Sequence, residues 1–293
     1  MKSVLKLSFV TLLISSVFAS CDKEYEPIEV VDEQRIQSYI TSQKLSLIKD
    51  SSGIYYKVLN PGNGAVPKNS EIIYFTYTAK SVSGTNYYTP ASYTSSFNYL
   101  GYVKPDAWRL ALSKIKKGGK VQVVFPSSLG FGRNGANFFT GANVFKGNDV
   151  LDSELELLDV KSVPEMEDVI ITKYLAANSL TGFEKLPSGI HYKILNPGSG
   201  LQTVKDTSTL SVAYTGKLLN GTVFDSATKE KAYTSKLNLL IDGWKQTLLF
   251  LKKGGKIRIL IPSFYGYGGQ GSREIPPYSI LDFEVELTDI KSN

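Results

Sequence analysis

Residues 53–64 read GIYYKVLNPGNG, and residues 189–200 read GIHYKILNPGSG, 136 positions later. Further pairs of similar segments follow: KKGGK at 116–120 with 252–256, Trp108 with Trp244, and LDSELEL at 151–157 with LDFEVEL at 281–287. The offsets of these pairs are 136, 136 and 130 positions. Solenoid repeats return after only about 20–50 residues. The long and stable offset therefore indicates two copies of one domain.

The size and composition of the chain agree with two folded domains and exclude several kinds of site. The 293 residues, 42% hydrophobic and 20% charged, fit domains of about 100–200 residues and argue against disorder along the whole chain. One cysteine excludes an internal disulfide framework and Cys-rich zinc or iron–sulfur sites, and one histidine excludes sites with several histidine ligands. The net charge is +6 for the whole chain and about +4 without the two lysines of residues 1–20, which is too mild to indicate a nucleic-acid partner.

The first twenty residues are typical of a secretory signal peptide. Lys2 and Lys6 precede an apolar stretch at residues 7–18, and the small residues Ala19 and Ser20 follow it. Twelve residues in a helix reach about 18 Å, which is too short for a bilayer core of about 30 Å. Residues 1–20 are therefore predicted to be a cleaved signal and not a membrane span.

The only cysteine, Cys21, directly follows this predicted signal. The sequence FASC at residues 18–21 resembles the lipobox of bacterial lipoproteins, in which the cysteine is lipidated after cleavage. An ordinary cut after Ala19 is the alternative. The resemblance implies a lipid-anchored protein of the cell envelope, on the periplasmic or surface face of the outer membrane. Asp22–Glu33 carries six acidic residues and one lysine, so residues 21–33 are interpreted as a solvated tether.

Each copy shows the same order of predicted helices and strands. Each copy opens with a predicted helix that has one apolar face, formed by Ile36, Tyr39 and Ile40 in the first copy and by Ile171, Tyr174 and Leu175 in the second. A short helix, predicted at 107–117 and at 243–253, ends with lysines before Gly-Gly. Strands are predicted at 71–80, 120–125 and 151–160 in the first copy and at 208–217, 256–261 and 281–290 in the second. Several strands with one short helix indicate an α+β domain with a mainly antiparallel sheet. Residues 162–167 are the predicted linker, so the domains are predicted at 34–162 and 166–293.

Three other features are interpreted without a function of their own. GFGRNG at 130–135 and GYGGQG at 266–271 match the dinucleotide fingerprint, but proline interrupts the strand end before each and no helical pattern follows. The sequon Asn220-Gly221-Thr222 fits a hairpin turn. His191 takes the place of Tyr55 in the first copy, which predicts a surface position without a catalytic role.

Several motifs of the second copy lie in the order found in one known family. They are VAYTG at 212–216, GTVFDS at 221–226, IDGW at 241–244, IPSFYGYG at 261–268, IPP at 275–277 and LDFEVEL at 281–287. With these motifs the second copy resembles the FK506-binding protein (FKBP) family of peptidyl-prolyl isomerases. The resemblance implies a half-barrel of antiparallel strands wrapped round one helix, with an aromatic pocket between them. It also implies isomerisation of proline-containing polypeptides without a metal or a cofactor.

The same resemblance implies roles for nine residues of the second copy. Asp225, Tyr214 and Tyr267 are the implied catalytic residues, with Asp225 and Tyr214 on the polar side of the pocket. The Tyr267 hydroxyl and the backbone N–H of Ile241 would donate hydrogen bonds to a substrate carbonyl. The implied substrate-binding residues are Trp244 as the floor, Phe224 and Phe283 as walls, Ile241, Ile275, and Tyr233 as a further wall. The alternative for these aromatics is a plain hydrophobic core.

The first copy departs from this pattern at most of these positions. Tyr77-Thr78 and Trp108 persist, but Phe131 replaces the loop tyrosine, Ser153 replaces the wall phenylalanine, FKG at 145–147 replaces Ile-Pro-Pro, and YYTP at 87–90 carries no acid. We therefore predict the same fold with little or no isomerase activity. Nine aromatics lie between Tyr74 and Tyr102, and they form either a platform for a peptide or glycan or the packing of strands and pocket.

Two classes of function remain open at this point. The first is a membrane-tethered isomerase for exported proteins, active in its C-terminal domain. The second is an envelope lipoprotein that binds peptides or glycans without catalysis. The proposed isomerisation needs a shaped and dry pocket and no acid–base pair, which fits a chain nearly devoid of histidine and cysteine.

Overall fold

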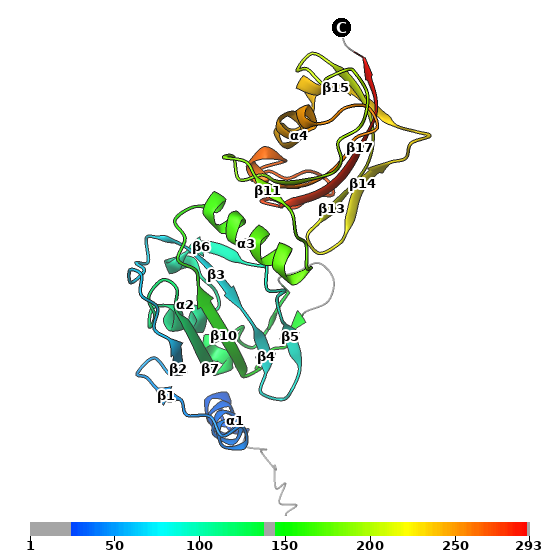
Figure 1. Ribbon diagram of the computed structural model, residues 1–293. Helices are drawn as coiled ribbons and strands as arrows, with labels where there is room; N and C mark the ends of the chain where they lie inside the picture. Colours follow the sequence, from blue (N-terminus) through cyan, green and yellow to red (C-terminus); the bar gives the residue numbers. More distant parts are fainter. Residues whose placement is uncertain (1–24, 138–143, 292–293) are drawn as a thin grey trace, which may run out of the picture.

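A computed structural model describes residues 25–137 and 144–291, which form two large antiparallel sheets and one short strand pair (Figure 1). The first sheet curves around helix α2 (Asp106–Leu112) and the second around helix α4 (Asp242–Thr247). The predicted α+β class with two similar sheet domains is thereby confirmed. The predicted signal and Cys21 lie outside the described residues. Among the helices of the described part, none has the length and apolar character needed to cross a membrane.

The first sheet has the strand order β1-β2-β7-β10-β3-β6, and β4 pairs with both β10 and β5. Its strands are β1 (Ile48–Lys49), β2 (Tyr55–Asn60), β3 (Ile72–Tyr77), β4 (Ala79–Ser81), β5 (Asn86–Tyr88), β6 (Ser96–Tyr99), β7 (Lys120–Phe125) and β10 (Leu151–Leu157). A separate short pair, β8 (Ala136–Asn137) and β9 (Val144–Phe145), lies in the loop after β7. Short 3-10 turns are η1 (Leu100–Tyr102) and η2 (Ser127–Leu129).

The second sheet repeats this topology in the order β11-β12-β16-β17-β13-β14, with β15 paired to β13. Its strands are β11 (Glu184–Lys185), β12 (His191–Asn196), β13 (Thr209–Leu218), β14 (Val223–Ala227), β15 (Tyr233–Lys236), β16 (Lys256–Ile261) and β17 (Leu281–Lys291). Its 3-10 turns are η3 (Leu237–Leu239), η4 (Leu248–Phe250) and η5 (Ser263–Tyr265). The sequon at Asn220 forms the predicted hairpin turn between β13 and β14, where Leu218 N donates to Thr222 O.

Each short helix fills the concave face of its own sheet with apolar side chains. Trp108 and Leu112 of α2 are buried in one cluster with Val121 and Leu155 of the first sheet. Trp244 of α4 and the following turn make the matching cluster with β16 and β17 in the second domain. Strands in which apolar and polar residues alternate bury one face of the sheet, and in each domain the short helix covers that face.

Two longer helices, α1 (Ile28–Ser42) and α3 (Val163–Ala177), pack on the other side of the sheets. Ile36 of α1 is buried with Tyr55 and Val124 of the first sheet. Ile171 of α3 is buried with Leu260 of the second sheet, and the same cluster includes Tyr74 of the first domain. Helix α3 therefore packs on both domains and lies between them (Figure 1).

Aromatic pairs complete the contact between the two domains. Tyr93 of the first domain packs edge-on against Tyr174 of α3, with ring centroids 5.0 Å apart. Phe97 of β6 packs in the same manner against Tyr278 of the second domain, also at 5.0 Å. These contacts place the loop before β17 against the sheet of the first domain.

The two short helices are shorter than predicted. They were expected to run to Lys117 and Lys253, but α2 ends at Leu112, and α4 ends at Thr247 before the turn η4. The reason is a competing backbone contact: Lys116 N donates to Pro61 O, and Lys252 N donates to Pro197 O. These bonds to the proline carbonyls of the repeated Asn-Pro-Gly segments replace further helical bonds.

The predicted acidic tether and the predicted linker are partly wrong, because both contain the first turns of a helix. Helix α1 begins at Ile28, inside the segment interpreted as a tether, and its Asp32 is 1% exposed. Asp32 Oδ2 accepts hydrogen bonds from Ser127 N at 2.9 Å and Ser127 Oγ at 2.6 Å. Helix α3 begins at Val163, capped by Ser162, so the predicted linker is helical from Val163 onward.

The surface position predicted for His191 is also wrong. The side chain is 7% exposed, and its Nδ1 lies 3.1 Å from Gly189 O. Burial lowers the pKa of His191, although nearby Asp168 opposes the shift, so the imidazole is held in its neutral form. Tyr55, its counterpart in the first copy, is buried as well and donates a hydrogen bond to Glu33.

Candidate active site

A pocket of about 220 Å³ opens in the second domain between helix α4 and the concave face of the sheet. It is lined by residues from strands β13, β14, β15 and β17, from the turn η3, from the loop after η5 and from the start of α4: Tyr214, Asp225, Tyr233, Leu239, Leu240, Ile241, Trp244, Tyr267 and Phe283. The helix supplies the floor because Trp244 is its third residue and points into the sheet, where it is 4% exposed. Strands β13 and β17 are hydrogen-bonded neighbours, so they bring Tyr214 and Phe283 to the same wall.

The aromatic rings of the pocket hold one another in edge-to-face contacts. The rings of Trp244 and Phe283 lie 5.2 Å apart at 79°, and those of Tyr214 and Trp244 lie 5.1 Å apart at 82°. Phe224 packs behind Phe283 at 5.4 Å and 88°. Such arrangements add stability beyond the buried area. Gly216 is required beneath them, because a Cβ there would lie 2.6 Å from the Phe283 ring and 2.7 Å from the Phe224 ring.

The polar edge of the pocket is formed by two tyrosines and one carboxylate. The Tyr214 hydroxyl donates a hydrogen bond to Asp225 Oδ2, and Asp225 Oδ1 accepts one from Ser226 N at 2.8 Å. Burial and the nearby Asp225 charge raise the pKa of Tyr267 above its usual 10.0. A raised tyrosine pKa keeps the neutral hydroxyl at physiological pH, so Tyr267 is a hydrogen-bond donor at the pocket edge.

A second donor stands at the start of helix α4. Ile241 is the residue before the helix, in an extended conformation, and it lines the pocket. Among the described residues its backbone N–H has no hydrogen-bond acceptor. The first N–H groups of a helix have no partner within the helix. The pocket therefore presents two donors, one from the backbone and one from a tyrosine, above an apolar floor.

The structure brings seven of the nine residues singled out from the sequence to the pocket wall. The other two lie behind it: Phe224 supports Phe283, and Ile275 is 3% exposed in the core of the domain. Leu239 and Leu240 line the pocket and were missed. No signal in the sequence marks them, because two leucines before a helix read as ordinary core residues, whereas Leu239 is 75% exposed.

Residues 200–288 match the family described as FKBP-type peptidyl-prolyl cis-trans isomerase. The second domain is an FKBP-type isomerase domain. The chain is 42% identical over 116 residues to the FKBP-type isomerase FkpA of Buchnera aphidicola (subsp. Schizaphis graminum), a match over 39% of this chain and 46% of the relative. It is 47% identical over 105 residues to a probable FKBP-type isomerase of Haemophilus influenzae, over 35% and 43% of the two chains.

The crystal structure of FkpA from Escherichia coli is also similar to this chain. The identity is 32%, the match covers 43% of this chain and 67% of the other, and the TM-score is 0.36. The chain spans less than half the length of the two curated relatives named above. The similarity to these relatives therefore concerns the FKBP domain and not the whole of either protein.

The first domain has the same framework as the FKBP domain, but aromatic rings occupy the equivalent pocket. The ring of Tyr77 lies only 4.1 Å from that of Trp108, and Tyr88 packs against Tyr77 at 4.8 Å. Phe131, at the position of Tyr267, lies 4.2 Å from Phe145. Of the two interpretations of the aromatic stretch, packing therefore accounts for most of it, whereas Tyr99 and Tyr102 are exposed.

Two further differences separate the first domain from the FKBP domain. Pro105 stands before helix α2 where Ile241 stands before α4, and proline has no N–H to donate. The 136-residue spacing of the repeat pairs Pro105 with Ile241, so the lost donor is a signal that the sequence carries. Trp108 Nε1 donates to Ser153 Oγ at 3.0 Å, whereas Trp244 Nε1 has no acceptor among the described residues.

A cavity of about 240 Å³ remains beside Trp108 in the first domain, displaced toward strand β6. Its lining is Phe75, Tyr77, Ser96, Phe97, Asn98, Val103, Lys104, Trp108 and Phe145. No carboxylate belongs to this lining, and the tyrosine of the FKBP loop is replaced by phenylalanine. The first domain therefore lacks three polar features of the FKBP pocket: the aspartate, the loop hydroxyl and the backbone N–H.

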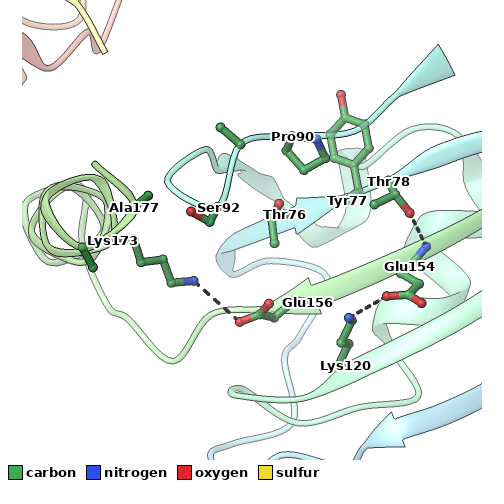
Figure 2. A pocket seen from close by; sticks show the side chains of 12 residues that line it. Thr76, Tyr77, Thr78, Pro90, Ser92, Lys120, Glu154, Glu156, Lys173 and Ala177 are labelled. Atoms are coloured by element: carbon green, nitrogen blue, oxygen red, sulfur yellow. Dashed lines mark hydrogen bonds and ion pairs between the residues drawn. The ribbon is translucent and has the colours of Figure 1, made fainter. Parts of the chain in front are cut away.

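A larger cavity, of about 560 Å³, lies between the first sheet and the end of helix α3 (Figure 2). Figure 2 shows its charged residues facing one another: Lys173 pairs with Glu156 at 3.8 Å and Lys120 with Glu154 at 2.5 Å. Since these charges are already paired, the cavity presents no group poised for chemistry. Within the described ranges, no three His, Cys, Asp or Glu side chains are grouped as a metal site would need.

Proposed function

We propose that the protein is a peptidyl-prolyl cis–trans isomerase that acts on proline-containing polypeptides of the cell envelope through its FKBP domain. The observation that carries the proposal is the pocket itself, in which two hydrogen-bond donors face an apolar aromatic floor. The residue types and their order match a family of isomerases over residues 200–288.

The geometry supports a mechanism that depends on binding the twisted form of the peptide bond. Rotation about an X–Pro bond has a barrier of about 20 kcal/mol, because the planar amide is stabilised by resonance. The twisted amide loses this resonance and part of its dipole, so an apolar pocket favours it relative to water. The proline ring would lie on Trp244, between Phe283 and Tyr233. Interactions that are stronger with the twisted form than with the planar form accelerate the reaction.

The polar groups would hold the substrate in this twisted geometry. Ile241 N–H and the Tyr267 hydroxyl would donate hydrogen bonds to substrate carbonyls. Neither donor has a hydrogen-bond acceptor among the described residues. Asp225 fixes the Tyr214 hydroxyl and places a negative charge at the edge of the pocket. No nucleophile is needed, because no covalent bond to the substrate forms.

The first domain is proposed to be non-catalytic. Trp244→Ala is expected to lower kcat/KM for isomerisation of a proline peptide by at least about 100-fold, since the pocket floor is lost. The matched variant Trp108→Ala is expected to leave kcat/KM within about twofold. Both variants are measured in the full chain by the rate of cis–trans interconversion. If Trp108→Ala lost activity and Trp244→Ala kept it, catalysis would lie in the first domain and the proposal would be contradicted. If the protein only binds peptides, neither the wild type nor the variants would accelerate isomerisation.

The cell-envelope part of the proposal rests on the first 21 residues of the sequence. A charged start, a short apolar segment and Cys21 after two small residues support export followed by lipidation. Labelled fatty acid should be incorporated into the wild-type protein in bacterial cells and be lost in Cys21→Ala. Equal labelling of the two proteins would contradict the anchor and leave the isomerase proposal intact.

A further inference from the structure

A buried carboxylate on helix α3 contacts the loop that carries Tyr267. Glu167 is 1% exposed, and its Oε2 accepts a hydrogen bond from Ser263 N at 3.0 Å. Burial raises the pKa of Glu167, and the hydrogen bonds from Ser263 oppose this shift. Glu167 lies outside the residues 200–288 that match the FKBP family. Glu167 and Ser263 are 96 residues apart in the sequence. The buried hydrogen bond between them therefore fixes helix α3 relative to the loop that carries Tyr267.

The Ser263 backbone connects this carboxylate to the segment around Tyr267. Ser263 O accepts hydrogen bonds from Gly266 N at 3.0 Å and from Gly268 N at 2.8 Å. These two donors flank Tyr267 on either side. Ser263 therefore links the two: its N–H donates to Glu167, and its carbonyl accepts hydrogen bonds from both sequence neighbours of Tyr267. The φ of Gly268 is +61°, in the left-handed region that favours glycine, so the turn after Tyr267 has a defined shape.

The first domain contains the same arrangement on helix α1. Asp32 accepts from Ser127 N and Oγ, and Ser127 O accepts from Gly130 N at 3.0 Å and Gly132 N at 2.9 Å. The residue between these glycines is Phe131, which has no hydroxyl. The chain therefore provides two copies of one carboxylate contact, of which only one supports a tyrosine in a candidate active site.

We propose that Glu167 is a positioning residue that fixes the Tyr267 hydroxyl for catalysis by anchoring Ser263. This inference rests on the proposed isomerase function. Loops at a protein surface are mobile unless other elements hold them, and a donor contributes to catalysis only where it is fixed before the reaction. Helix α3 thus supports the loop of the FKBP domain that carries Tyr267, although it precedes the residues that match the family.

Five variants of the full chain test this role. Glu167→Ala removes the acceptor and is expected to lower kcat about tenfold with little change in KM, since a displaced Tyr267 costs about one hydrogen bond. Glu167→Gln keeps a carbonyl acceptor of nearly the same shape and should stay within about twofold of wild type. Asp32→Ala removes the equivalent contact in the first domain and should leave kcat unchanged. In Glu167→Ala/Tyr267→Phe, kcat should equal that of Tyr267→Phe alone.

Hydrogen exchange gives a readout that does not depend on activity. Exchange at residues 263–268 should rise in Glu167→Ala and stay at the wild-type rate in Glu167→Gln and Asp32→Ala. Additive losses in the double variant, or wild-type exchange and kcat in Glu167→Ala, would overturn the positioning role. A wild-type chain that does not accelerate isomerisation would refute the proposed function, and with it the catalytic role assigned to Glu167; exchange at 263–268 would then report only the anchoring contact.

Discussion

Replacing Asp225 by alanine and Tyr267 by phenylalanine in one chain is expected to lower kcat/KM for prolyl isomerisation about 100-fold. Tyr267→Phe removes one of the two donors of the pocket, and Asp225→Ala leaves the Tyr214 hydroxyl without its acceptor. Each loss corresponds to about 1.4 kcal/mol, which is tenfold in rate. The reaction is measured on a peptide with a single X–Pro bond, using the full chain.

The controls for this double variant address folding and the first domain. Asp225 and Tyr267 are both exposed, so the melting temperature of the double variant should stay close to that of wild type. Tyr77→Phe removes the tyrosine hydroxyl at the equivalent pocket of the first domain, and it should leave kcat/KM within about twofold. A double variant that keeps more than a third of wild-type activity would show that the polar edge of the pocket has no catalytic role.

Asp282→Ala is expected to destabilise the FKBP domain by about 3–5 kcal/mol, because it leaves a partly buried arginine without its partner. Arg258 donates to Asp282 through Nε at 2.9 Å and Nη2 at 2.6 Å, and the Tyr174 hydroxyl donates to the same carboxylate at 2.9 Å. The carboxylate therefore joins β16, β17 and helix α3. Unfolding in urea, followed by fluorescence, measures the loss.

The matched variant of the first domain is Asp152→Ala. Asp152 accepts hydrogen bonds from Gln122 and from the Tyr39 hydroxyl, and an exposed lysine, Lys80, lies 3.2 Å away. The residue on the neighbouring strand that binds Asp152 is Gln122, a neutral amide, where the second domain has Arg258. Removing Asp152 therefore leaves no buried charge. We expect a smaller loss, of about 1–3 kcal/mol. Equal losses in the two variants would contradict the importance of the Arg258 charge.

Much of the fold follows from local features of the sequence. Strands β7 and β16 lie where their β-branched residues predicted them, at Lys120–Phe125 and Lys256–Ile261. The ends of α2 and α4 did not follow, because their last turns compete with bonds to Pro61 and Pro197, which are distant in sequence. A propensity argument contains no information about such partners.

The charged and polar residues show the same limit more sharply. Asp32 lies in a run of acidic residues that is typical of a solvated segment, yet it is buried against Ser127, 95 positions away. Tyr267 and Trp244 were found because they belong to motifs of a known family. Leu239 and Glu167 belong to none of the motifs, and only the folded chain brings them to the pocket and to the loop behind it.

The most direct test of the account is the rate of cis–trans interconversion of a proline peptide with catalytic amounts of the full chain. We predict an acceleration that is proportional to protein concentration, persists in Trp108→Ala and disappears in Trp244→Ala. An interconversion rate equal to that of the peptide alone, with correctly folded wild-type protein, would contradict the central claim that the aromatic pocket of the second domain is an isomerase site.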